Sequence, residues 1–248
     1  ELKPLNGYTC QDPRRGPYNA KGCLDNFASL VYEGEPGLSS GSTQLGLRHR
    51  LEVFRTEGKG WGVRSWDHIK AGEFVCEFTG EMLTHAEAEA RGAHEKQEEW
   101  EGAGEYDEYM FNLGISHPVS LGTLLRGEYT DEEKKEWTEV HCRPTPTPTQ
   151  VRSMLTHAGL KDEDADEQFE LDGLRAGSLA RYINSSDLPN LYCQTVVTGH
   201  LDPRKGRICL FALHDIPALT ELTYDYGADY RTKLLGDEYQ ERLHRGSR

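Results

Sequence analysis

Two tyrosines near the end of the chain stand in a pattern that could line a channel with hydroxyl groups. Tyr224 and Tyr226 are at positions i and i+2 of the run 222–227. Side chains two positions apart on a strand share a face, so both hydroxyls could line one channel. The structural alternative is a tyrosine pair packed at the edge of a core, with its hydroxyls in water. The pair is therefore a candidate site for which a packing role stays open.

A tryptophan between two glycines and a polar run form two further candidates. Gly60-Trp61-Gly62 would allow a ligand to approach the backbone closely, because glycine has no Cβ. The same pattern suits a β-bulge, or a hairpin with Trp61 in the core. The polar run 181–190 offers amides and backbone groups that could bind the edge of a ligand or form a network of Asx turns.

Short strands and turns must position these candidates. Apolar or alternating runs bounded by turn residues predict strands, at 51–54, 61–65, 73–78, 109–113, 179–184, 193–197, 207–213 and 222–227. Thr84 and Glu87 have capping-box spacing and predict a charged, solvated helix over 84–100. The sequence therefore predicts a mainly β fold with some α-helix.

Three segments lie outside this strand pattern. Residues 1–47 predict an irregular lead-in, and 229–243 is a helix candidate of mixed charge. The segment 115–168 reads as an insertion with too little apolar content to belong to a core. Within it we expect an acidic helix over 131–140 and an extended, polyproline-like spacer over the Pro/Thr tract 144–149.

The charge balance restricts the class of partner. The 248 residues contain 28 Lys+Arg against 42 Asp+Glu, a formal net charge of −14. Phosphate recognition needs a basic surface, so direct sequence-specific binding of nucleic acid is not expected. An acidic surface does suit a Lys/Arg-rich protein partner. No apolar run approaches the roughly 20 residues that span a bilayer, so no membrane association is expected.

The cysteines are scattered and form no metal-binding pattern. No two of the six are spaced as in CxxC, the full set being Cys10, Cys23, Cys76, Cys142, Cys193 and Cys209. Cys76, Cys193 and Cys209 lie in apolar runs, where a buried free thiol is expected. Neither a zinc site nor a disulfide framework is predicted, and a reducing, intracellular compartment is favoured.

Taken in chain order, the predicted strands and the candidate motifs resemble the SET-domain protein lysine methyltransferases. They are most similar to the plant suppressor-of-variegation type, which methylates lysine nine of histone H3. The matching stretches are 49–54, 59–66, 72–81, 107–111, 181–184 and 210–227. The resemblance implies a fold of small curved β-sheets with a knot-like crossing of two C-terminal segments.

The same resemblance implies a division of the chain. A degenerate pre-SET-like lead-in would span 1–47, the SET domain 48–228 and a C-terminal flank 229–248. The segment 115–168 would be the variable insert of the family.

Roles for individual residues follow from the resemblance. Tyr226 corresponds to the catalytic tyrosine, and Tyr224 and Tyr109 are the other residues expected to be catalytic. Tyr224 is at the position where Phe or Tyr tunes how many methyl groups are added, and its hydroxyl favours mono- or dimethylation. The residues expected to bind S-adenosyl-L-methionine are Lys59, Gly60, Trp61, Asp107, Tyr109, Arg181, Asn184 and Ser185.

The implied function is S-adenosylmethionine-dependent methylation of a histone H3 tail, lysine nine first, in nuclear chromatin. A weakened or inactive SET module that binds chromatin or protein partners is one alternative. A lysine methyltransferase with a non-histone substrate is another. No metal ligand is expected, and zinc is not among the expected cofactors.

The chain departs from the family at two places. The usual Asn-His-Ser-Cys becomes Asn184-Ser185-Ser186-Asp187, and a buried Asp187 without a partner would be costly. The lead-in keeps only Cys10 and Cys23 of the family's zinc-binding cysteines, and the cysteine-rich tail is absent. Two thiols cannot assemble a zinc cluster.

Overall fold

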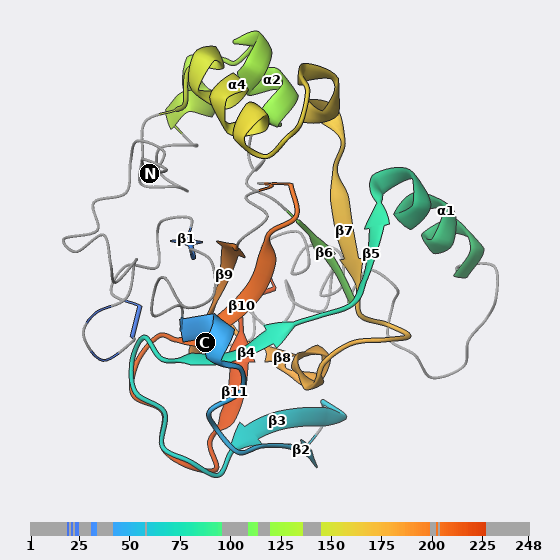
Figure 1. Ribbon diagram of the computed structural model, residues 1–248. Coiled ribbons are helices and arrows are strands. Elements are labelled where there is room, and N and C mark those ends of the chain that lie inside the picture. The colour runs from blue at the N-terminus through green and yellow to red at the C-terminus, as the bar shows by residue number, and fades with distance from the viewer. Residues whose placement is uncertain are drawn as a thin grey trace, which may run out of the picture.

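The computed structural model describes residues 19, 21, 23–24, 31–33, 42–57, 59–95, 109–113, 120–135, 145–198, 202 and 204–226. Within these residues the strands form three small sheets, with short helices at the periphery (Figure 1). The predicted helix 229–243 lies outside them, as do residues 96–100 of the helix predicted over 84–100 and residues 136–140 of the helix predicted over 131–140. The predicted mainly β architecture is confirmed.

The first sheet has the strand order β1-β9-β10-β4. β9 (Leu191–Val197) and β10 (Arg207–Ala212) form an antiparallel pair, and β4 (Phe74–Phe78) pairs antiparallel with the far edge of β10. β1 (Val31–Tyr32) runs parallel to β9. The lead-in that we expected to be irregular therefore contributes a strand to this sheet.

The second sheet, in the order β2-β3-β11-β8, contains the candidate residues. β2 (Leu51–Arg55) and β3 (Trp61–Ser65) form an antiparallel hairpin. β11 (Glu221–Tyr224) lies antiparallel to β3 and parallel to the two-residue β8 (Asn184–Ser185). This sheet therefore joins three segments that are far apart in the chain. The knot-like crossing stays a prediction.

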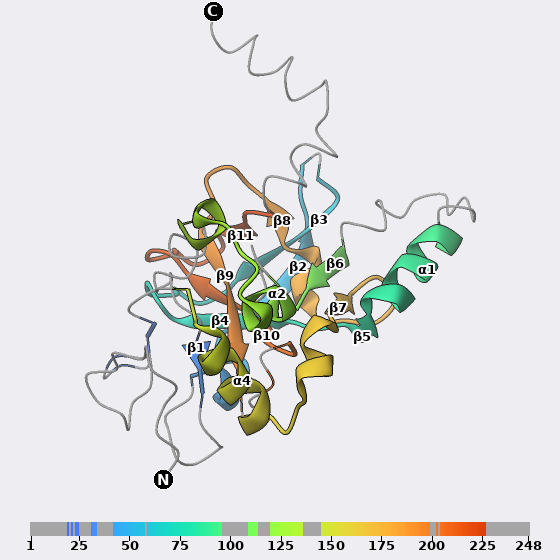
Figure 2. The same ribbon diagram turned by 90° about the horizontal axis from the view of Figure 1, so that it is seen from above.

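The third sheet, β5-β7-β6, links the helical periphery to the other sheets. β7 (Phe169–Asp172) is its central strand, between β5 (Glu81–Thr84) and β6 (Met110–Asn112). α1 (His85–Glu95) follows β5 directly and projects from the side of the molecule (Figures 1 and 2).

The capping box predicted for α1 is present. The backbone N–H of Thr84 donates to Oε2 of Glu87 at 2.9 Å, and the N–H of Glu87 donates to Oγ1 of Thr84 at 3.4 Å. The two contacts satisfy donors that the first turn of a helix leaves unpaired.

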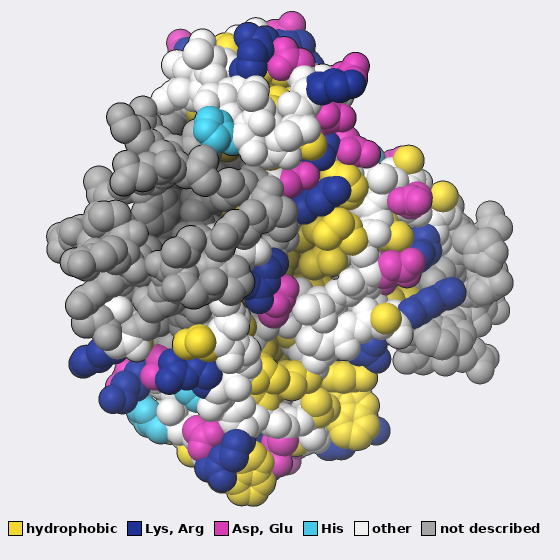
Figure 3. Space-filling model, in the orientation of Figure 1, with side chains coloured by type: hydrophobic (Ala, Val, Ile, Leu, Met, Phe, Trp, Pro, Cys, Tyr) yellow, Lys and Arg dark blue, Asp and Glu magenta, His cyan; other side chains and the backbone are white. Residues whose placement is uncertain are grey.

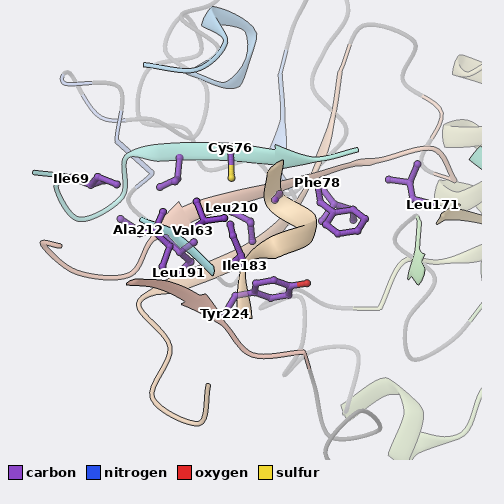
Figure 4. Packing of buried hydrophobic residues seen from close by; sticks show 14 of the residues in the cluster. Val63, Ile69, Cys76, Phe78, Leu171, Ile183, Leu191, Leu210, Ala212 and Tyr224 are labelled. Carbon is purple, nitrogen blue, oxygen red and sulfur yellow. The ribbon is translucent and has the colours of Figure 1, made fainter. Parts of the chain in front are cut away.

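One hydrophobic cluster joins the three sheets (Figure 4). Val63 of β3, Cys76 of β4 and Leu210 of β10 are buried in it together with Ile183 and Tyr224. Burial of one such aliphatic side chain contributes about 1.5–3 kcal/mol. Tyr224 is thus part of the main core, and Cys76 and Cys209 are buried free thiols, as predicted, whereas Cys193 is half-buried.

The insertion has a hydrophobic cluster of its own, so our prediction that it contributes no core is wrong. The cluster lies between α2 (Leu121–Arg126), α4 (Pro148–His157) and the 3-10 helix η3 (Asp162–Asp166), at the top of Figure 1. Its buried residues are Leu121, Leu124, Leu125, Val151, Leu155, Ala165 and, from β9, Val197. Helical i, i+3 and i+4 spacing places these few apolar residues on one face, which total apolar content cannot show.

The Pro/Thr tract is only partly extended. Thr147 caps α4, with a capping box to Gln150, and Pro148 occupies the first turn. Proline is tolerated there because the first turn has no use for its missing N–H. The spacer predicted over 144–149 is therefore wrong from Pro148 onward. The described part of the helix predicted over 131–140, residues 131–135, is helical.

The strand predicted over 179–184 is also wrong. Leu179–Tyr182 forms the 3-10 helix η4, capped by the hydroxyl of Ser178, and only Asn184 and Ser185 are extended in a sheet.

Among the described residues, no helix has the length and apolar character to cross a membrane.

Candidate active site

Side chains of the second sheet tie the candidate segments together. Nδ2 of Asn184 donates to the carbonyl oxygen of Trp61 at 3.0 Å, across 123 positions of sequence. It also donates to Oε1 of Glu221 at 2.8 Å. Nζ of Lys59 donates to the carbonyl oxygen of Ser185 at 3.1 Å. We call this region, residues 59–62, 184–185 and 221–226, the β8–β11 corner.

The two positions beside Trp61 favour glycine for different structural reasons. Gly60 has φ +72°, in the left-handed region that favours glycine. A Cβ on Gly62 would lie 2.5 Å from Cγ2 of Thr56, 3.1 Å from Oε1 of Glu221 and 3.3 Å from Nδ2 of Asn184. Glycine at this position therefore lets the Asn184 and Glu221 side chains lie directly against β3.

Trp61 is not a core residue. Its side chain is 49% exposed, and the Arg55 guanidinium stacks 4.7 Å from the centre of its ring. Apolar side chains gather on this part of the surface, over the β2–β3 hairpin (Figure 3). The alternative that placed Trp61 in the core is wrong, although the segment does begin β3 of a hairpin; approach of a ligand to the backbone of Gly60-Trp61-Gly62 stays a prediction.

The two tyrosines lie together with unequal burial. Their ring centres are 4.6 Å apart; Tyr224 is 3% exposed and Tyr226 is half-buried. The hydroxyl of Tyr226 donates to the carbonyl oxygen of Ile183 at 2.5 Å, and its backbone N–H donates to Oγ of Ser185 at 3.4 Å. Parallel pairing of Tyr224 with Ser185 brings β8 to this position. The side chain of Tyr226 is thus fixed in place and is the more exposed of the two.

Tyr224 faces an apolar interior. Burial raises its pKa well above the ordinary value, and the neighbouring Tyr226 adds to the shift. Burial likewise raises the pKa of Cys76 to about 12. Both groups are therefore neutral at physiological pH, and Tyr224 can accept or donate a hydrogen bond without acting as a base.

The remaining predicted site residues make their described contacts outside the β8–β11 corner. The carbonyl of Tyr109 accepts from the N–H of Gly173 at 2.9 Å, which anchors Tyr109 to the turn after β7. Arg181 donates to the carbonyls of Gly173 at 3.3 Å and Leu174 at 3.2 Å, so it braces the same turn. Asp107 lies outside the described residues. Cofactor contacts by these three residues stay predictions.

The altered stretch after Asn184 causes no burial problem. Asp187 is exposed, so the cost expected for a buried carboxylate does not arise. The N–H of Ser186 donates to the carbonyl of Tyr224 at 3.2 Å, which holds the stretch against β11.

Glu221 was not predicted as a structural residue of the corner, and Asn190, which ends the polar run 181–190, was given no such role. Glu221 holds the Asn184 amide, and Asn190 brackets β11 by donating to the carbonyl of Glu221 at 2.7 Å and accepting from the N–H of Thr223 at 2.9 Å. The only signal for Glu221 was its place at the start of a strand, on the face shared with Thr223.

The comparisons with known proteins define the class. The SET-domain family matches residues 60–227, and the chain belongs to this family. The histone-lysine N-methyltransferase SUVH6 of Arabidopsis thaliana, H3 lysine-9 specific, is 33% identical over 219 residues, which are 85% of this chain and 23% of that protein. The predicted resemblance to the plant suppressor-of-variegation type is therefore confirmed.

Solved structures agree with this assignment. The crystal structure of Arabidopsis thaliana SUVH6 in complex with SAM matches with a TM-score of 0.55 and 31% identity, covering 86% of this chain and 35% of that one. KRYPTONITE in complex with mCHH DNA, H3(1-15) peptide and SAH matches with a TM-score of 0.52 and 28% identity, covering 86% and 32%. The chain spans about a quarter of the length of the curated relatives it matches.

The β8–β11 corner has groups that suit S-adenosylmethionine, whose amino-acid end is a zwitterion. Lys59 carries a cation, and Asn184, whose Nδ2 donates to Glu221, carries a side-chain oxygen that can accept. Space is open above Gly60, where an added Cβ would meet nothing within 4 Å. No group of three or more His, Cys, Asp or Glu side chains that could hold a metal occurs in the described part of the chain, from which Cys10 and Cys142 are absent.

Proposed function

We propose that this chain is an S-adenosylmethionine-dependent protein lysine methyltransferase that acts on a histone H3 tail, with lysine nine as the expected target. The observation behind the proposal is the pairing of β8 with β11, which joins Asn184, Tyr224 and Tyr226 in one corner. The names of SUVH6 and the H3 peptide bound to KRYPTONITE support the substrate class. Nuclear chromatin is the corresponding location.

The cofactor supplies a methyl group on a positively charged sulfur, which the protein has to align with an amine. Lys59, Gly60, Trp61, Asn184 and Ser185 would hold it in the corner, and Arg181, which donates to the turn after β7, would contact it as well. We propose Asp107 and Tyr109 as further contacts. Alignment of two reactants is the main contribution an enzyme makes to such a displacement.

Tyr226 would orient the substrate amine. Because its hydroxyl donates its hydrogen to the carbonyl of Ile183, the oxygen presents lone pairs that accept from an N–H. Nearby, Tyr224 and the core cluster form an apolar wall. A low-dielectric surrounding disfavours the charged ammonium form of lysine, so the amine can lose its proton without a strong base.

The expected product is mono- or dimethyllysine. Tyr224 adds a hydroxyl beside Tyr226, with the ring centres 4.6 Å apart. This hydroxyl can hold a water molecule where further methyl groups would have to rotate.

The test is transfer of labelled methyl groups to an H3 tail peptide, with mass spectrometry to count them. A peptide with lysine nine replaced by arginine is the substrate control. Tyr226→Phe keeps the ring and removes the oxygen, so we expect at least a ~100-fold lower rate, because misaligned reactants cost about that factor. Its thermal unfolding should stay within a few degrees of the wild type, because the variant loses one hydrogen bond worth about 1 kcal/mol.

Different outcomes would contradict different parts of the proposal. Unchanged transfer by Tyr226→Phe would remove Tyr226 from catalysis, and abundant trimethyl product would contradict the product state. Cofactor binding without transfer to any protein would favour the second candidate, a SET module that binds partners without catalysis. That candidate is supported by the altered stretch Ser185-Ser186-Asp187. Transfer only to non-histone proteins would keep the reaction and change the substrate.

A further inference from the structure

The orientation of the Asn184 side-chain amide is fixed by its neighbours. Its Nδ2 lies 3.0 Å from the carbonyl oxygen of Trp61 and 2.8 Å from Oε1 of Glu221. A carbonyl and a carboxylate accept hydrogen bonds and have no hydrogen to donate. Rotating the amide by half a turn would place Oδ1 against both oxygens, so the hydrogen-bond network decides the assignment.

This orientation turns Oδ1 of Asn184 away from both partners as an acceptor. In the described part of the chain it accepts no hydrogen bond, and Asn184 is half-buried at the edge of the corner. Lys59 reaches the carbonyl of the adjacent Ser185. Oδ1 of Asn184 could accept from the ammonium group of an amino acid, and the cation of Lys59 could attract its carboxylate. The adenosine group of the cofactor has no net charge and would gain from neither.

Glu221 is itself held in place. It begins β11, opposite Arg64 in the register with β3, and its own carbonyl accepts from Nδ2 of Asn190 at 2.7 Å. The missing Cβ at Gly62 lets its carboxylate reach Asn184. Of the two oxygens that bind Nδ2, that of Glu221 is the one a substitution can remove, since the other belongs to the backbone.

We propose that Glu221 is a positioning residue, which orients the Asn184 carboxamide so that Oδ1 accepts from the ammonium group of bound S-adenosylmethionine. This inference rests on the proposed function, since it requires that the corner binds the cofactor. Glu221 acts through Asn184. Without it the amide is held by one acceptor and can rotate, which would present Nδ2, a donor, to a cation.

The experiment measures binding of two ligands by calorimetry. S-adenosylhomocysteine has the amino-acid end, and 5′-methylthioadenosine has the adenosine and the thioether without it. We expect Glu221→Ala to weaken S-adenosylhomocysteine at least fivefold and 5′-methylthioadenosine less than twofold. Glu221→Gln retains an acceptor oxygen and should recover most of the lost affinity.

A matched control and a double variant separate this role from a general loosening of the sheet. Glu52→Ala removes another carboxylate of the same sheet, one that binds Arg64 and Trp66, and should change neither affinity. In an Asn184→Ala background, Glu221→Ala should cause no further loss, because residues that act through one another are not additive.

Each other result has a definite meaning. If the wild-type chain binds no S-adenosylhomocysteine, the proposed function fails. If it binds and Glu221→Ala leaves the affinity unchanged, or weakens both ligands equally, the role of Glu221 is overturned and the proposed function stands. A further loss in the Asn184→Ala background would also overturn it.

Discussion

The β8–β11 corner and the insertion are built in opposite ways. In the corner, hydrogen bonds link positions 123 and 126 apart, such as Asn184 with Trp61 and Lys59 with Ser185. In the insertion, the cluster around Leu124 comes almost entirely from residues 121–165. The corner therefore requires the whole SET core to be folded, whereas the insertion is mostly a local unit.

The insertion is attached to the core at a few points. Val197 of β9 enters its cluster. The buried Arg204, just before β10, donates to the carbonyl of Asp164 and to Oε2 of Glu167, both at 2.8 Å. No such contact leads directly to the corner among the described residues. Changes to the packing of the insertion should therefore alter stability and leave cofactor binding in place.

The largest effect on stability is expected for Leu124→Ala. Leu124 is fully buried in the insertion cluster, and such a truncation costs about 2–5 kcal/mol. We expect this loss in the free energy of unfolding, with an affinity for S-adenosylhomocysteine within twofold of the wild type. Arg152→Ala, on the exposed side of α4, is the matched control and should cost below about 1 kcal/mol. Equal losses of stability and affinity in Leu124→Ala would refute the separation.

A smaller loss of stability, coupled to a loss of cofactor affinity, is expected at Asp172. This residue ends β7, the strand that joins the insertion to the turn that Arg181 contacts. Asp172 is 1% exposed; it accepts from Nη1 of Arg91 at 2.7 Å and from the N–H of Leu174 at 2.8 Å. Asp172→Asn keeps the size and weakens a hydrogen bond to a charged group, which costs about 1.5–3 kcal/mol. Because Arg181 rests on this turn, the affinity for S-adenosylhomocysteine should also fall a few-fold.

The control for this variant is Glu81→Gln, which changes the other, exposed partner of Arg91. Exposed ion pairs contribute about 0–1 kcal/mol, so the control should be near wild type in both measurements. A stable Asp172→Asn protein with normal affinity would mean that the turn does not couple the two regions.

Local patterns were sufficient for much of the corner. The predicted strand 61–65 is β3 over the observed residues Trp61–Ser65. Tyr224 and Tyr226 lie together as their spacing predicted, although the strand predicted over 222–227 ends at Tyr224. These features depend on neighbours in sequence. The order of the motifs then identified the SET family, which the match over 60–227 confirms.

Other features depend on partners that sequence does not reveal. Leu179–Tyr182 has strand-like composition, but Arg181 bonds back to the turn at 173–174 and the segment coils into η4. Glu221 has its partner, Asn184, 37 positions away. The insertion cluster was missed because a few leucines at helical spacing bury one another despite a polar average.

The smallest effect is expected from an ion pair at the start of α1, outside the β8–β11 corner and the insertion cluster. Nδ1 of His85 lies 2.6 Å from Oε1 of Glu170 on β7, and its Nε2 lies 3.7 Å from Glu89. The hydrogen bond with Glu170 raises the pKa of His85, and the charges of Glu170 and Glu89 add to the shift. The pair therefore stabilises the fold fully below the unfolded pKa of about 6.5, and this contribution is lost as pH rises through the folded pKa.

The expected size of this contribution is small because the His85 side chain is 56% exposed. Screening by solvent limits such a pair to about 0.5 kcal/mol. The free energy of unfolding of the wild type relative to His85→Gln should thus fall by about this amount between about pH 6 and 8, while cofactor affinity stays the same in both proteins. A difference that grew with pH would show that the imidazole is held neutral. A matching pH trend in affinity would show that α1 is coupled to the corner, which the described contacts do not predict.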